Sequence, residues 1–346
     1  MMQLALGLMM LIVGAELMVR SAVRVAARLQ VRPLIIGLTV VAFGSSAPQM
    51  AISTQAVLND APDIALGSVV GSSVFSLLVT LGCCALITPL RVSRQLVRLD
   101  LPVMLGASAL VFVLAFIGPL GPVEGIVLLT ALAGYLILLL RQAREHGRTY
   151  PAAPVPTRTW PRCTIMFVVG IGLLVGGGRW LLDATVDVAG DLGLSERVIG
   201  LTLVAVSASL PELVTSLIAA LRGQRDIAVA NVVGSNLFNL LGVLGFTALL
   251  APLPLSVSPN ALAFDLPVML GVAALSLPLF YSGMRITRGE GLMLLALYAM
   301  YGLHLVSFAT GMPLAARLEH AMLRYLLAPI ALVIAFTTWR AWRRQH

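Results

Sequence analysis

The chain has 346 residues, of which 59% are hydrophobic and only 11% charged, and its mean hydropathy is +0.98. Water-soluble domains carry charged residues at about a quarter of their positions, so this composition excludes an ordinary soluble protein and predicts an all-α, polytopic membrane protein. The net charge of +8 comes from arginine alone, and in a membrane protein basic residues report orientation, so we expect no nucleic-acid partner.

Apolar stretches long enough to cross a bilayer, about 20 residues each, follow one another along the chain. The first five lie at residues 3–27, 33–58, 64–90, 99–118 and 121–141. Six more lie at residues 163–187, 195–221, 227–252, 260–282, 288–309 and 321–340. The first stretch lacks the basic start of a signal peptide and carries Glu16 and Arg20, so we expect it to be retained. The sequence therefore predicts eleven membrane helices.

Arginines gather in alternate loops between these stretches. They are Arg24, Arg28 and Arg32, then Arg91, Arg94 and Arg98, then five between residues 141 and 162, then Arg222 and Arg225, then Arg285 and Arg288, then Arg340, Arg343 and Arg344. Because basic loops stay in the cytoplasm, we expect the N-terminus outside and the C-terminus in the cytoplasm, across a plasma membrane of bacterial inner-membrane type. Arg317 and Arg324 are exceptions, and they bear only on the eleventh helix.

The chain divides into two halves that repeat each other. Residues 36–82 align without a gap with residues 199–245, and 23 of the 47 aligned positions are identical. The first half, residues 1–141, contains five predicted helices, an odd number, so the second half must enter the membrane with reversed sense. Inverted repeats are typical of secondary transporters, which bind substrate near the bilayer midplane where the repeats meet.

Three segments complete this organisation. Residues 142–162 combine several prolines and arginines without apolar periodicity, which predicts a cytoplasmic linker. The second inverted repeat, also of five helices, covers residues 163–309. Residues 310–346 are interpreted as an extra C-terminal helix with a basic tail.

Two prolines fall in mid-span at corresponding positions of the repeats. Pro48 and Pro211 each remove a backbone hydrogen bond, and an irregular backbone at this depth persists only against protein, water or an ion. A simple kink is the alternative. We favour ion ligation because hydroxyl groups precede each proline, while Gln49 follows one and Glu212 the other.

Glu212 is the strongest single candidate for function. A carboxylate at bilayer depth costs a few kcal/mol on insertion scales and by default marks a functional site, although a protonated side chain bonded to a neighbouring helix is possible. The acids Asp63 and Asp226 lie at helix starts, where a structural role is favoured. For Glu16 the alternatives are an ion-path role and an ion pair with Arg20.

Two further helices carry polar pairs spaced four residues apart, and therefore on one helix face. The pairs are Ser72 with Ser76, and Ser235 with Asn239. Facing the proline-containing helices, their oxygens would complete a set of hard ligands suited to Na⁺ or Ca²⁺, and the lack of His and Cys argues against zinc or copper.

These motifs carry a family resemblance. The stretches GSSAPQM (44–50) with DIALGSVVGSSVFS (63–76), and SASLPEL (207–213) with DIAVANVVGSNLFN (226–239), resemble the two alpha repeats of sodium/calcium exchangers in the calcium/cation antiporter superfamily. The resemblance implies ten helices in two inverted halves, exchange of Na⁺ or H⁺ for Ca²⁺, and no cofactor. The partners it implies are inorganic cations and membrane lipid. No predicted span pairs a nucleophile with a His base, so we also expect no enzymatic activity.

The resemblance also implies a ligand set. In that family the acid after each mid-helix proline holds the ion, with nearby hydroxyls and backbone carbonyls. Carried over, ion binding falls to Glu212 and Ser209 in the second repeat and to Gln49, Ser45 and Ser46 in the first. The carbonyls of Ala42 and Ala205 would contribute, and Ser72, Ser76, Ser235 and Asn239 would close the site.

Gln49 departs from the family pattern, which has Glu in both repeats. Asn239 is likewise neutral where some relatives carry Asp, so a divalent ion would leave a net positive charge in a low-dielectric site. Three hypotheses follow. The first is a Ca²⁺ antiporter driven by Na⁺ or H⁺; the second is exchange of a monovalent cation or proton; the third is a membrane protein that binds a cation without transporting it.

Overall fold

The computed structural model describes residues 2–29, 31–58, 62–146, 160–191, 205–281 and 284–309. Most of the expected linker and the expected eleventh helix at 321–340 lie outside these residues. So does the beginning of the expected helix at 195–221.

Helices dominate the first half. Its elements are α1 (Met2–Leu29), α2 (Pro33–Ile36), the π-helical segment η1 (Gly37–Val41), α3 (Ala42–Leu58), α4 (Pro62–Phe75), η2 (Ser76–Thr80), α5 (Leu81–Ile87), strand β1 (Leu90–Arg91), η3 (Leu96–Asp100), α6 (Leu101–Ile117) and α7 (Pro122–His146). Several of these elements are consecutive parts of longer helices. α2, η1 and α3 form one continuous helix, and α4, η2 and α5 form another.

The second half repeats this plan. Its described elements are α8 (Trp160–Asp191), α10 (Ala205–Leu221), α11 (Arg225–Leu237), η7 (Phe238–Val243), α12 (Leu244–Leu250), η8 (Ala261–Asp265), α13 (Leu266–Tyr281), strand β2 (Arg285–Ile286) and α14 (Arg288–Ala309). The π-helical segments η2 and η7 occupy corresponding places in the two repeats, and so do η3 and η8. Each π-bulge shifts the register of its helix, a feature found often at functional sites.

Within the described residues, eight helices are long and apolar enough to cross a membrane. They are Ala5–Ala27, Pro33–Leu58, Ala65–Ile87, Leu96–Ile117, Pro122–Ala143, Pro161–Trp180, Arg225–Leu250 and Ala261–Tyr281. The shorter apolar helix Val206–Leu221 stands where the expected helix at 195–221 ends. The prediction of a helical, polytopic membrane protein is therefore confirmed, with one addition: β1 and β2 form a small antiparallel sheet that the all-α prediction did not include.

The two halves interlock through their outer helices. α7 of the first half packs against α12 of the second, and α14 of the second half packs against α5 of the first. Glycines make both approaches close: a Cβ on Gly125 would lie 2.7 Å from the carbonyl oxygen of Gly245, and one on Gly291 would lie 2.9 Å from that of Gly82. Such glycine contacts let helix backbones approach where a larger side chain would hold them apart.

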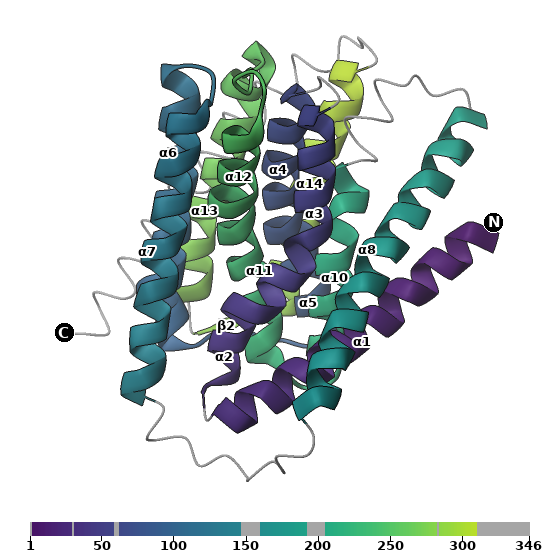
Figure 1. Cartoon of the computed structure of the whole chain (residues 1–346), viewed down its shortest axis with the longest axis vertical. Coiled ribbons are helices and arrows are strands. Elements are labelled where there is room, and N and C mark those ends of the chain that lie inside the picture. The colour runs from purple at the N-terminus through teal and green to yellow at the C-terminus, as the bar shows by residue number, and fades with distance from the viewer. Residues whose placement is uncertain are drawn as a thin grey trace.

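Two helices lie at an angle beside this bundle. Figure 1 shows α1 and α8 packed along each other on one flank, tilted relative to the more upright helices. Both contact α10, so this pair adjoins the proline-containing helices of the core.

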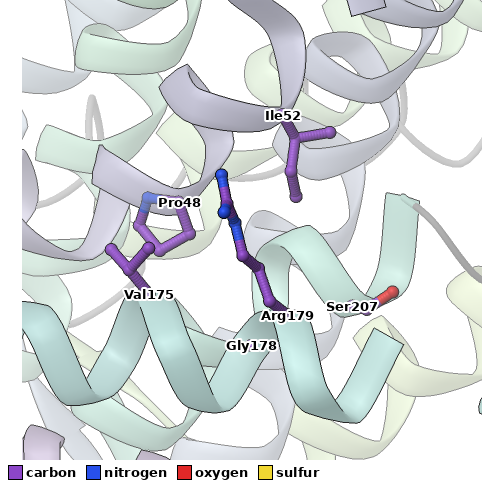
Figure 2. Close-up of a pocket in the computed structure, with 6 residues that line it drawn as sticks. All are labelled: Pro48, Ile52, Val175, Gly178, Arg179 and Ser207. Atoms are coloured by element: carbon purple, nitrogen blue, oxygen red, sulfur yellow. The ribbon is translucent and has the colours of Figure 1, made fainter. Parts of the chain in front are cut away.

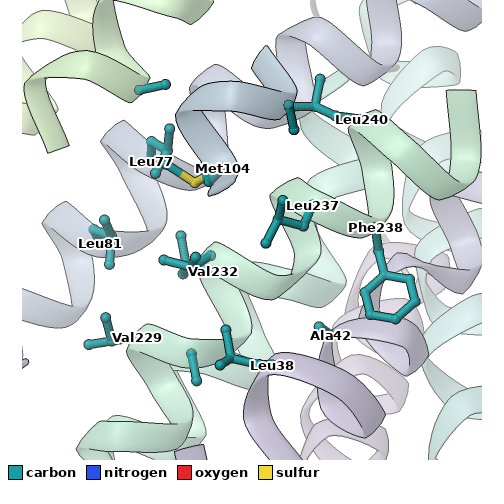
Figure 3. Close-up of a cluster of buried hydrophobic side chains, with 14 of the residues drawn as sticks. Leu38, Ala42, Leu77, Leu81, Met104, Val229, Val232, Leu237, Phe238 and Leu240 are labelled. Atoms are coloured by element: carbon teal, nitrogen blue, oxygen red, sulfur yellow. The ribbon is translucent and has the colours of Figure 1, made fainter. Parts of the chain in front are cut away.

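The centre of the molecule is built from both halves. Residues 227–245, which include most of α11 and all of η7, are buried without interruption. Figure 3 shows Leu38 and Ala42 of the first half beside Val232, Leu237 and Phe238 of the second, in one apolar cluster. Because the seam between the repeats is tightly packed, polar groups placed along it are shielded from lipid and from bulk water.

Short backbone pairings tie corresponding loops together. β1 pairs with β2 between Leu90 and Ile286, and an isolated bridge joins Leu120 to Leu255. The first pairing brings together two loops that the sequence predicts to be cytoplasmic; the second joins two that it predicts to be external. The loop contacts therefore agree with the expected grouping of loops.

The prolines do not interrupt their helices. α3 continues through Pro48 and α10 continues through Pro211, so the irregular backbone expected at these residues is absent from both. In the first repeat the irregularity lies earlier, in η1. A proline can remain inside a membrane helix when neighbouring groups compensate for the hydrogen bond that it removes.

Candidate ion-binding site

The Glu212 carboxylate is fully buried at the seam between the two halves. α10 carries it directly after Pro211. Oε1 accepts hydrogen bonds from Asn239 Nδ2 at 2.9 Å and from Ser46 Oγ at 3.4 Å, and Oε2 accepts one from Ser76 Oγ. Ser46 and Ser76 belong to the first half, whereas Asn239 belongs to the second, so both repeats contribute donors to one carboxylate.

A second layer of hydrogen bonds holds these donors in place. Asn239 Nδ2 also donates to Ser72 Oγ at 3.3 Å, and Ser209 Oγ donates to the same atom at 2.9 Å. Oδ1 of Asn239 is buried and accepts no hydrogen bond from any described residue. A buried amide oxygen without a donor is costly, and a cation is a ligand that would satisfy it.

Gln49 occupies the corresponding position in the first half but has different neighbours. Its Nε2 donates to Ser53 Oγ at 3.1 Å and to Ser68 Oγ at 2.9 Å. Its Oε1, like the amide oxygen of Asn239, is buried and accepts no bond from the described residues. The amide thus turns its donor toward two hydroxyls and leaves its acceptor available.

Ser45 links the halves on the other side of this region. Its hydroxyl lies 3.0 Å from Asn231 Oδ1 and 3.0 Å from Ser235 Oγ, and it donates to the Ala42 carbonyl at 3.2 Å. Ser45 was expected beside the ion with Ser46. The structure instead bonds it to Asn231 and Ser235, while Ser46 reaches Glu212.

Four polar residues that the sequence analysis did not select join the network. Asn231 donates to Ser216 Oγ at 2.9 Å and to the Glu212 carbonyl at 3.5 Å. Asn231 and Ser216 are the repeat counterparts of Ser68 and Ser53, which bond to Gln49. The signal was present in the alignment: serine occupies both 53 and 216, and the polar residues 68 and 231 each lie four residues before Ser72 and Ser235.

The expected ligands therefore fall into three groups. Glu212 contacts Ser46, Ser76 and Asn239 directly, with Ser72 and Ser209 behind them. Gln49 lies with Ser53 and Ser68, and Ser45 lies with Ser235 and the Ala42 carbonyl. Ala205 is the first described residue of α10, and its contacts lie outside the described part of the chain.

The chemistry of this network is that of a hard-cation site. Its side chains offer hydroxyl, amide and carboxylate oxygens, and no group of three or more His, Cys, Asp or Glu side chains occurs in the described part of the chain. Oxygen donors suit Na⁺ and Ca²⁺. Glu212 is the single ionisable side chain in it.

The other acids considered above have structural surroundings where they are described. Glu16 forms ion pairs with Arg20 and with Arg222, whose Nε lies 2.6 Å from Oε2 of Glu16. This contact joins α1 to the end of α10. Asp226 lies in the first turn of α11, as expected for an acid at a helix start. The side chain of Asp63 lies outside the described part.

Comparison with known proteins gives a consistent picture. The sodium/calcium exchanger protein family matches residues 1–141 and 163–307. The putative antiporter CaxA of Alkalimonas amylolytica is 35% identical over 253 residues, which are 71% of this chain and 79% of CaxA. The sodium/calcium exchanger MaX1 of Methanosarcina acetivorans is 30% identical over 337 residues, which are 86% of this chain and 96% of MaX1.

The fold agrees with these sequence matches. A solved structure of the sodium-calcium exchanger NCX_Mj, from a soak with Na⁺ and Sr²⁺, superposes with a TM-score of 0.74 at 29% identity, covering 86% of this chain and 96% of that one. The family match falls in two parts, one over residues 1–141 and one over residues 163–307. The chain is therefore a member of the sodium/calcium exchanger family of cation antiporters.

Proposed function

We propose that this protein is a secondary active antiporter that moves Ca²⁺ outward in exchange for Na⁺ or H⁺, with each ion binding in turn at Glu212. The observation that carries the proposal is the fully buried Glu212 carboxylate, which takes hydrogen bonds from Ser46 and Ser76 of one half and Asn239 of the other. A site assembled at the seam of two inverted repeats changes its accessible side when the halves repack, which is the basis of alternating access.

The groups around Glu212 fit exchange of ions at one site. A serine hydroxyl can donate to the carboxylate or rotate and offer its lone pairs to a cation. Negative charge at Glu212 can therefore be stabilised either by hydrogen bonds or by a bound ion. The oxygens of Gln49 and Asn239 that lack donors supply two further ligands without needing to break an existing bond.

The charge of the site motivates a second candidate function, exchange of a monovalent cation or proton. Gln49 is held as a neutral amide by Ser53 and Ser68, so Glu212 alone supplies negative charge. A divalent ion would leave one uncompensated positive charge in a low-dielectric interior, which a monovalent ion or proton would not. A third candidate, cation binding without transport, would use the same ligands.

We further propose that the N-terminus faces outward and the C-terminus faces the cytoplasm of a cell bounded by this plasma membrane. Support comes from the alternation of arginines and from the β1–β2 pairing, which places the loop with Arg91 beside the loop with Arg285. The division into residues 1–141, a linker at 142–162, residues 163–309 and a C-terminal helix in 310–346 belongs to this proposal.

The deciding experiment is uptake of ⁴⁵Ca²⁺ into proteoliposomes loaded with Na⁺, repeated with an outward proton gradient. Wild type is compared with Glu212→Gln and Gln49→Glu. Uptake by wild type that is lost in Glu212→Gln supports the calcium antiporter. Loss of charge at Glu212 should abolish it because no other carboxylate lies in the described network.

The remaining outcomes separate the alternatives. Uptake only by Gln49→Glu would show that the natural ion is monovalent and that the missing charge sets this preference. Saturable ⁴⁵Ca²⁺ binding by wild type with no flux under either gradient would contradict antiport and favour the binding protein. Glu290→Gln serves as the control, since Glu290 contacts only Thr287 at an exposed helix start among the described residues.

A further inference from the structure

A narrow cleft reaches the proline-containing helices from the flank formed by α8. It is lined by Pro48 and Ile52 of α3, Val175, Gly178 and Arg179 of α8, and Ser207 of α10. Its volume of about 10 Å³ is close to the space that one water molecule needs. Figure 2 shows Arg179 extending from α8 toward α3, with its guanidinium group between Pro48 and Ile52.

The lining of the cleft includes an exposed arginine and two buried residues that are close in sequence to the candidate ligands. Arg179 is exposed, whereas Pro48 and Ser207 are buried. Pro48 directly precedes Gln49, and Ser207 lies between Ala205 and Ser209 on the helix that carries Glu212. At the same crossing, a Cβ on Gly178 would lie 3.6 Å from Cγ of Pro211, the residue before Glu212.

The arginine also has a defined place along its helix. It lies in the half of α8 (Trp160–Asp191) that is farther from the linker. In the proposed orientation this is the outer half. The guanidinium of Arg179 brings a positive charge to the lining of the cleft.

We propose that Arg179 determines charge selectivity in the access path to the cation site, by lowering the affinity for every cation and lowering it most for divalent ones. The inference rests on the proposed function, because it requires a cation site at Glu212. In this role Arg179 does not ligate the ion. Its fixed charge raises the electrostatic potential along the path, which disfavours rebinding of Ca²⁺ from the outer side.

The physics makes a quantitative prediction. The interaction energy of an ion with a fixed charge is proportional to the charge of the ion. Removing Arg179 should therefore change the dissociation constant for Ca²⁺ by the square of the factor by which it changes that for Na⁺. A threefold tightening for Na⁺ would accompany about a ninefold tightening for Ca²⁺.

The test measures equilibrium binding of ⁴⁵Ca²⁺ and ²²Na⁺ to the purified full chain at low and high ionic strength. The variants are Arg179→Gln, which removes the charge, and Arg179→Lys, which keeps it. Arg162→Gln is the matched control: Arg162 is an exposed arginine of the same helix, seventeen residues earlier and so about 25 Å away along the axis.

We expect Arg179→Gln to bind both ions more tightly in the squared ratio, with a smaller effect at high salt because screening weakens the field. Arg179→Lys and Arg162→Gln should resemble wild type. Unchanged affinities in Arg179→Gln, or equal factors for the two ions, would overturn the inference while leaving the proposed function intact. If wild type and all variants bind neither ion, both the proposed function and this inference fail.

Discussion

Gln49 donates its amide nitrogen to Ser68 at 2.9 Å while its amide oxygen, buried in the same place, receives no donor from the described residues. These contacts fit a neutral amide at position 49, whose oxygen can still accept a hydrogen bond or bind a cation. Ser53 supplies the second acceptor for the amide, at 3.1 Å. The counterpart of Gln49 in the second repeat is Glu212. Equivalent positions of the two halves therefore carry a neutral amide and a carboxylate.

The substitution Gln49→Glu should therefore strengthen Ca²⁺ binding more than Na⁺ binding. The Ser53 hydroxyl, which now accepts from the amide, can instead donate to a carboxylate, and Ser68 can do so by giving up its hydrogen bond to the Ala65 carbonyl. We expect at least a tenfold lower half-saturating concentration for ⁴⁵Ca²⁺ binding, equivalent to about 1.4 kcal/mol. Gln55→Glu, which places the same charge on the exposed side of α3, is the control and should leave affinity unchanged.

Ser76→Ala should destabilise the protein by removing a donor from the buried Glu212 carboxylate. Loss of a hydrogen bond to a charged group costs about 1.5–3 kcal/mol, and thermal unfolding in detergent measures it. Ser73→Ala is the matched comparison, because the buried Ser73 hydroxyl has no partner among the described residues and its removal should be neutral or slightly stabilising. Equal effects of the two substitutions would contradict the assigned contact.

Gly234→Ala should loosen the seam between the halves. A Cβ at this position would lie 2.7 Å from the carbonyl oxygen of Leu38 and 2.7 Å from Cβ of Ala42, so backbone must move. Overpacking of this kind typically costs about 1–3 kcal/mol, and the displacement of the neighbouring Ser235 should also weaken ion binding.

Gly67→Ala is the control for this prediction. Its Cβ would meet no atom within 4 Å, and alanine favours a helix over glycine. We expect an unchanged or slightly higher melting temperature. If Gly234→Ala melts at the wild-type temperature as well, the packing described for this seam is incorrect.

Tyr135→Phe should destabilise the protein by removing the hydrogen-bond donor of a second buried acid, Asp100. The Tyr135 hydroxyl donates to Asp100 Oδ1 at 3.1 Å, Asp100 is fully buried, and its Oδ2 has no partner among the described residues. Removing the donor should lower the free energy of unfolding by about 1–3 kcal/mol. Asp265 and Tyr301 form the corresponding pair in the second half, at 3.0 Å.

Tyr301→Phe gives an internal comparison. Asp265 is only half-buried and has a second donor in Asn260, at 3.5 Å, so the loss should be smaller than in Tyr135→Phe. Thermal unfolding of the two variants side by side measures the difference. A larger loss in Tyr301→Phe would show that burial of the acid does not set the cost.

Much of the candidate site could be predicted from the repeat. The constant offset between residues 36–82 and 199–245 aligns Pro48 with Pro211 and Ser46 with Ser209. Comparison of the halves therefore selected the two residues that follow the prolines, Gln49 and Glu212, without a structure. Helical spacing then placed Ser72 with Ser76 and Ser235 with Asn239. The repeat alignment and the helical spacing depend only on positions along the chain, so both can be obtained from the sequence alone.

The sequence by itself thus determined the membrane class, the inverted repeat and the unequal charge at its two key positions. Only the tertiary structure decided which hydroxyls reach Glu212, why Ser45 pairs with Asn231 instead, and that Arg179 of α8 reaches the cleft beside Pro48. These contacts join residues more than a hundred positions apart. They depend on how helices pack and on the direction of each side chain, and neither is written in the spacing of residues along one helix.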